Sequence, residues 1–72
     1  MKCVNYKHSK ENHQISLDAI KTIARCSNSH GWKHRVLRTP DNFQRIQFTA
    51  DDDVLFDPSL NTVLVSLGFK EV

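Results

Sequence analysis

Glycine, cysteine and long apolar runs are all scarce in this chain of 72 residues, and each scarcity narrows what the protein can be. With Gly31 and Gly68 as its only glycines, the chain has no glycine-rich loop of the kind that cradles phosphates in nucleotide-binding enzymes. It also lacks the GxSxG elbow of hydrolases and the HExxH helix of zinc peptidases. We therefore predict that the protein is not an enzyme.

Cysteine is limited to Cys3 and Cys26, which is too few for a disulfide framework, so we predict reduced thiols. Cys26, His30 and His34 recur every four residues, a spacing that would align zinc ligands only on one continuous helix. Gly31 and the polar residues before it predict that no helix runs through all three. We therefore expect neither a metal site nor any other cofactor.

No apolar run approaches the roughly 20 residues of a membrane span, and the polar start has no apolar core of a secretory signal. We expect a cytoplasmic protein with no membrane contact. The length leaves room for one domain. Residues 1–14 show no sustained period and are predicted to be an irregular arm, with at most a short strand at residues 3–6, before a single domain at residues 15–72.

Charge is distributed unevenly along the chain. Residues 1–45 carry a net charge of +6, whereas residues 46–72 carry −4 and include the aspartate run at positions 51–53. This separation of charge can steer an acidic ligand to the basic part of the chain. The two oppositely charged parts can equally pack against each other within the fold. The aspartate run lacks the alternate carboxylates, glycine and later glutamate of a calcium loop.

Two amphipathic helices are predicted. Ser16 is a good N-cap for the first, and the apolar residues at positions 17, 20, 23 and 24 fall on one of its faces. The second spans residues 58–67, begins at Asp57 and Pro58, and ends at Gly68 in a left-handed cap. It is expected to bury its four apolar residues at helical spacing: Leu60, Val63, Leu64 and Leu67.

The middle of the chain is harder to assign. Residues 32–37 fit both the helical period of about 3.6 residues and the strand period of two. We favour a helical turn because Trp32 and Val36 are four residues apart. Pro40 and the two residues after it predict a turn, and residues 43–48 are predicted to be a strand. The fold class expected from these elements is α+β: a small, mainly helical domain with a short β element.

Three segments, VLRTP, FQRI and SLNTVLVSLGF, resemble in their order the core of PUB (PUG) domains. In that family a helix ending in an Ile-Leu-Arg-Asn-Pro-like run precedes an aromatic-basic-x-Ile segment and a helix that ends in Leu/Met-Gly-Phe. The similarity covers about half of the chain. The resemblance implies a compact, mostly helical adaptor without catalysis, which grips the C-terminal tail of the AAA ATPase valosin-containing protein of the ubiquitin pathway, or a related short peptide.

The resemblance also implies a binding site. Phe43 matches the pocket aromatic of the family, and Arg38 matches its scaffold, whereas Arg35 stands where the family has a pocket asparagine. With Arg45, these arginines are the cations nearest to Phe43 in the sequence, and a guanidinium can take a peptide carboxylate by two parallel hydrogen bonds. The predicted peptide-binding residues are therefore Arg35, Arg38, Phe43 and Arg45.

Two other functions remain open at this point. The same basic and aromatic residues, with Trp32 and Lys33, have the composition of a nucleic-acid surface, although an aspartate loop close by would repel phosphate. A small basic nucleic-acid-binding protein is therefore the alternative to the peptide adaptor. A protein that uses an apolar helix face to assemble with a partner chain is the third reading.

Overall fold

The computed structural model describes all 72 residues and contains nearly equal amounts of strand and helix, 32% and 31%. The prediction of a mainly helical fold, made from the residues and implied by the PUB resemblance, is therefore wrong. In chain order the elements are β1 (Lys2–His8), α1 (Leu17–Ser29), β2 (Lys33–Arg38), β3 (Gln44–Ala50), α2 (Pro58–Ser66) and β4 (Phe69–Glu71).

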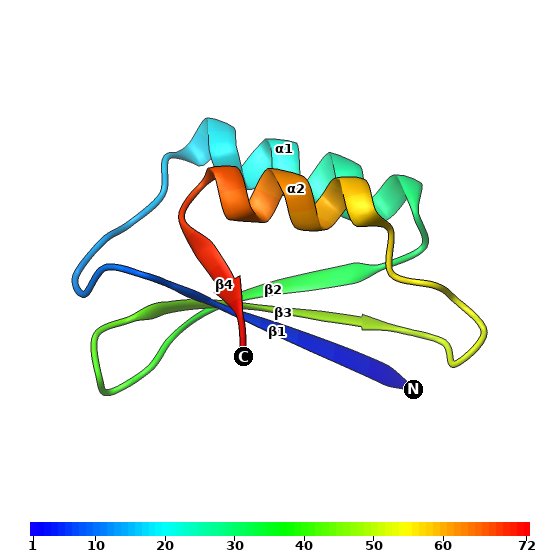
Figure 1. Cartoon of the computed structure of the whole chain (residues 1–72), viewed down its shortest axis with the longest axis horizontal. Helices are drawn as coiled ribbons and strands as arrows, with labels where there is room; N and C mark the ends of the chain where they lie inside the picture. The colour runs from blue at the N-terminus through cyan, green and yellow to red at the C-terminus, as the bar shows by residue number, and fades with distance from the viewer.

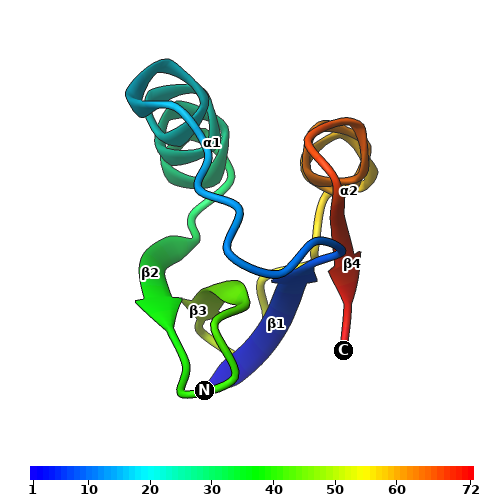
Figure 2. The same cartoon turned by 90° about the vertical axis from the view of Figure 1, so that its left-hand side faces the viewer.

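The four strands form one antiparallel sheet in the order β2-β3-β1-β4. Helix α1 connects β1 to β2 across β3, and α2 connects β3 to β4 across β1. Each connection is a split βαβ unit, and the two together give the ferredoxin-like arrangement. Both helices lie side by side on one face of the sheet, with α1 over the β2 side and α2 over the β4 side, as Figures 1 and 2 show. Neither helix is long and apolar enough to cross a membrane.

The core lies between the helices and the face of the sheet that they cover. Along β3 every second residue is buried, and Ile46 and Phe48 are fully enclosed. Tyr6 of β1 meets Phe48 edge-on with ring centroids 5.9 Å apart, and Leu60 and Leu64 of α2 are fully buried. The predicted burial of α2 is confirmed at these two leucines, while Val63 and Leu67 are only half-buried.

The helix ends predicted from the sequence are confirmed. The hydroxyl of Ser16 accepts a hydrogen bond from the backbone N–H of Ala19, and the carboxylate of Asp57 accepts one from the N–H of Ser59. Gly68 follows α2 with φ of +92°, and a Cβ there would lie 2.8 Å from Nε2 of His8. Glycine is required at this position by both backbone conformation and space.

Two segments differ from their predictions. Residues 1–14, predicted to be an irregular arm with at most a short strand at residues 3–6, contain the central strand β1 at residues 2–8. Residues 32–37, predicted to be a helical turn, lie mostly in the edge strand β2, which spans residues 33–38. The covered positions of β1 include Lys2 and His8, so its alternation is not one of apolar with polar residues. Strand β2 borders only β3 and buries little, which leaves a weak period-2 signal in its sequence. The predicted strand at residues 43–48 is confirmed by β3.

Candidate functional site

The face of the sheet turned away from the helices is open, as the lower side of Figure 1 shows. Because side chains alternate along strands, the residues of each strand that are not directed at the core point to this face. Ten side chains of the paired strands lie there, of which five are basic and none is acidic: Cys3, Asn5, Lys7, Lys33, Arg35, Leu37, Arg45, Gln47, Thr49 and Lys70. We call these residues the open face.

The basic residues concentrate in one row across the sheet. The register pairs Lys7 of β1 with Arg45 of β3 on one side and with Lys70 of β4 on the other. Three cations therefore stand directly opposite one another on three neighbouring strands, and we call them the basic row. Like charges in directly opposed positions destabilise a sheet, so the basic row is a cost to the fold.

One carboxylate, that of Asp41 in the turn before β3, touches the basic row. Its Oδ2 lies 3.3 Å from Nη2 of Arg45 and 3.7 Å from Nζ of Lys7. Hydrogen bonds from the Thr39 hydroxyl and from the backbone N–H of Phe43, followed by those two cations, lower the pKa of Asp41 from 3.8 to about 2. Asp41 is thus ionised at neutral pH and offsets one of the three charges.

Lys70 has no carboxylate partner, and Nε of Arg45 is buried without an acceptor.

Phe43 lies beside the basic row at the end of the same turn. The ammonium of Lys7 stands over its ring, 4.2 Å from the centroid, which is a cation–π contact. Phe43, Lys7 and Lys70 together line a surface hollow of about 200 Å³, completed by His8, Ser9 and Val72. A half-buried aromatic ring and two ammonium groups therefore border one small concave site.

Three of the four predicted binding residues lie on the same side of the sheet. Arg35, Phe43 and Arg45 belong to the open face or its rim, whereas Arg38 pairs with Gln44 and lies on the other side of β2. The guanidinium of Arg38 donates hydrogen bonds to the backbone carbonyls of His13 and Asn42, so it is separated from the site and already engaged.

Lys7 and Lys70, which complete the basic row, were not among the predicted binding residues. For Lys7 the local signal was limited to Val4 and Tyr6, because the next covered position holds the polar His8.

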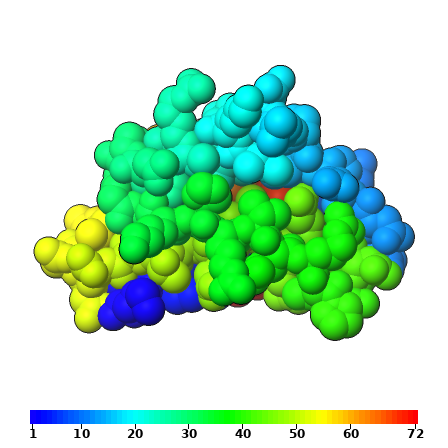
Figure 3. Space-filling view, turned by 180° about the vertical axis from the view of Figure 1, so that it is seen from behind, coloured from blue at the N-terminus to red at the C-terminus, as the bar shows by residue number.

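The aspartate loop lies at the far end of the sheet from the basic row. Residues 51–53 follow Ala50, which pairs with Lys2, whereas Arg45 is five residues earlier on β3, about 17 Å away at the rise of a strand. Figures 1 and 3 show this loop, in yellow, at one end of the molecule and the turn before β3 at the other. The expectation that the aspartates lie close enough to repel a phosphate is therefore wrong for the basic row, whereas Lys33, at the other end of the sheet, lines a hollow together with Asp51.

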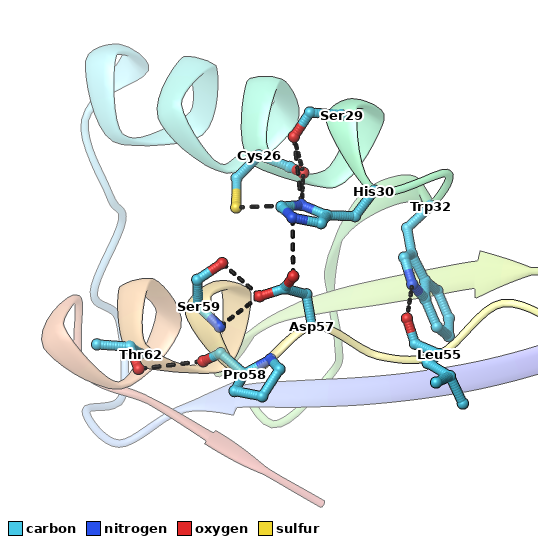
Figure 4. Close-up of polar contacts among 9 residues, drawn as sticks. All are labelled: Cys26, Ser29, His30, Trp32, Leu55, Asp57, Pro58, Ser59 and Thr62. Atoms are coloured by element: carbon cyan, nitrogen blue, oxygen red, sulfur yellow. Dashed lines mark hydrogen bonds and ion pairs between the residues drawn. The ribbon is translucent and has the colours of Figure 1, made fainter.

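A second cluster of functional side chains joins the two helices, as Figure 4 shows. Nε2 of His30 lies 2.8 Å from Oδ2 of Asp57, and its Nδ1 lies 2.8 Å from the carbonyl oxygen of Cys26 and 3.9 Å from the sulfur of that residue. The hydroxyl and backbone N–H of Ser59, with the nearby His30, lower the pKa of Asp57.

This cluster is arranged to hold the helices together rather than to activate a thiol. A proton on Nδ1 of His30 is directed to the Cys26 carbonyl, and so that nitrogen is not free to take a proton from the thiol. The imidazole that follows α1 contacts the carboxylate of Asp57 at the N-terminal end of α2, and the negative charge of this carboxylate complements the dipole of α2. None of the three surface hollows is lined by Cys26, His30 or Asp57.

Comparisons of the chain with family models, with curated proteins and with solved structures found no match. The resemblance to PUB domains and the peptide ligand that it implies stay predictions.

Proposed function

We propose that the protein binds nucleic acid, with the open face of the sheet against the sugar–phosphate backbone. The observation that carries this proposal is the basic row: Lys7, Arg45 and Lys70 stand side by side at an energetic cost, with Asp41 as their one carboxylate partner. Arg35 adds a fourth cation on the same face, one strand over and two positions along. A line of phosphates offers such a row several negative charges at once.

The arginines suit an acidic peptide end less well. Recognition of a carboxylate by a guanidinium depends on two parallel hydrogen bonds from a free fork. Arg45 already meets Asp41, and Arg38 donates to two backbone carbonyls on the other side of β2. Lys7 and Lys70 are point charges, which serve phosphate contacts well and need no fixed fork geometry. The peptide adaptor is thus the weaker of the two proposals.

The open face lacks aromatic side chains on its two central strands. Its positions on β1 and β3 hold Cys3, Asn5, Gln47 and Thr49 besides two members of the basic row. RNA-binding sheets that read sequence do so by stacking bases on aromatic residues of their central strands. We therefore expect most contacts here to be made with phosphates, and the affinity to depend little on sequence.

An NMR titration of the full chain tests the proposal. A single-stranded DNA of about 12 nucleotides should shift the backbone amides of β1, β3 and β4 on the open face, and a short acidic peptide should shift them much less. Lys7→Gln should weaken DNA binding, whereas the matched control Lys21→Gln, on the exposed surface of α1, should not. Shifts produced only by the peptide would contradict the proposal.

A further inference from the structure

The hollow between Phe43 and Lys70 differs from the rest of the open face in having an aromatic wall. Its volume is about 200 Å³, and its lining includes the apolar Phe43 and Val72 beside two ammonium groups. Elsewhere the open face carries amides, a hydroxyl, charged groups, the thiol of Cys3 and the aliphatic Leu37, and no aromatic ring. Contacts with phosphates would involve the two ammonium groups and give no role to the apolar wall.

The ring of Phe43 is covered by a group that a ligand can draw away. Nζ of Lys7 stands 4.2 Å from the ring centroid, at the end of a flexible four-carbon stem, and its other partner is Asp41 at 3.7 Å. A phosphate next to the hollow attracts this ammonium more strongly than a neutral ring does. Movement of Lys7 onto the phosphate would expose the ring face for stacking.

We propose that the hollow receives one unpaired nucleobase, stacked on Phe43, while Lys7 and Lys70 hold the phosphates on either side of it. This inference rests on the proposed function and makes it more specific, because it names single-stranded nucleic acid as the ligand. A base inside a duplex is paired and stacked, so it cannot enter the hollow without being turned out of the helix at a cost. A duplex therefore keeps the phosphate contacts and loses the base contact.

The test compares three fluorescein-labelled probes of about 12 nucleotides: a thymidine strand, a strand with abasic sugars throughout, and a duplex. Fluorescence anisotropy gives the affinity of the full chain for each one. The thymidine and abasic strands carry the same phosphates, so any difference between them reports the base alone. The variant Phe43→Leu removes the ring and keeps an apolar side chain, and Phe43→Tyr keeps the ring.

The wild-type protein is expected to bind the thymidine strand about 10-fold more tightly than the abasic strand, within the range for stacking of one base on an aromatic residue. Phe43→Leu should remove this difference, so that the ratio of the two affinities falls to about 1, while Phe43→Tyr should preserve the ratio. Melting curves check that both variants fold, and the wild-type comparison holds whether or not they do.

Equal affinity of the wild-type protein for the two strands would overturn the inference while leaving the proposed function standing. A folded Phe43→Leu variant that keeps the full preference for thymidine would also overturn it. If the wild-type protein binds none of the three probes, the proposed function fails and the base site fails with it. The two failures are therefore distinguishable by the abasic strand.

Discussion

The two faces of the sheet are built from the same strands and differ in almost everything else. On the covered face, Tyr6, Ile46 and Phe48 are fully buried beneath α1 and α2. On the open face, the alternate positions of those strands carry Lys7 and Arg45, which oppose each other directly. One face supplies the free energy of folding, and the other holds charges that folding alone does not require.

In so small a chain, binding residues can be placed on the open face without loss of the core. A domain of this length buries a modest fraction of its surface, so nearly every apolar side chain on the covered face is needed for stability. The side chains of the open face can change with little effect on the core. Substitutions on adjacent residues of one strand should therefore separate stability from binding.

The largest effect is expected from such an adjacent pair on β3. Phe48→Ala should lower the free energy of unfolding by about 3 to 5 kcal/mol, because the fully buried ring leaves a cavity between sheet and helices. Gln47→Ala, one residue away on the open face, should change it by about 0.5 kcal/mol or less. Chemical denaturation measures the free energy of unfolding of both variants. A similar loss of stability in the two would show that the faces do not differ as described.

A smaller effect, on binding rather than stability, is expected from the basic row. Lys7→Gln and Arg45→Gln should each weaken binding to single-stranded DNA by about 5- to 10-fold, because each removes one phosphate contact. Neither should lower the melting temperature much, because each substitution also relieves repulsion within the row. Loss of folding in both variants would mean that the row stabilises the sheet.

Removal of the carboxylate next to the row should act in the opposite direction. Asp41→Asn is expected to raise the affinity for single-stranded DNA by about 2- to 5-fold, because Lys7 and Arg45 are freed from their resident anion. The asparagine can still accept the hydrogen bond from the N–H of Phe43 that shapes the turn. Anisotropy titrations at one salt concentration measure the change, and a decrease in affinity would show that Asp41 positions the cations for the ligand.

The smallest effect is expected on the stability of the folded protein at low pH, through the carboxylate of Asp57 on the helix side of the sheet. The folded protein holds the pKa of Asp57 below its usual value of 3.8, chiefly through hydrogen bonds from Ser59. A lowered folded pKa gives stability that is complete above the unfolded pKa and is lost as pH falls from about 3.8 through the folded value. Asp57→Asn should therefore flatten the acid limb of a plot of melting temperature against pH. An unchanged limb would mean that Asp57 does not contribute to it.

The sequence was sufficient for the elements whose ends have local chemical signals. Ser16 begins α1, Asp57 and Pro58 begin α2, and Gly68 ends it, each for reasons that depend on residues within one or two turns. The strands β1 and β2 lack such signals: one is central but includes Lys2 and His8 among its covered positions, and the other is a polar edge. Tertiary pairing decides the structure of both segments.

The binding residues could be predicted only in part, because strand conformation and strand pairing decide which side chains share a face. Arg35 and Arg38 are three apart, which places them on one face of a helix but on opposite sides of a strand. Arg38 was included because it is close to Phe43 in the sequence, and the observed strand β2 places it on the other side of the sheet. Lys7 and Lys70 are neighbours only through the register of β1 with β4, and no local pattern in the sequence specifies a pairing between such distant residues.

The salt dependence of oligonucleotide binding tests the central claim most directly. If the basic row and Arg35 contact phosphates, the logarithm of the affinity for single-stranded DNA should fall linearly with the logarithm of salt concentration, with a slope of about −2 to −3. Lys7→Gln should make that slope shallower by about 0.7. A slope near zero, or one that Lys7→Gln leaves unchanged, would contradict the assignment of the open face as a phosphate-binding surface.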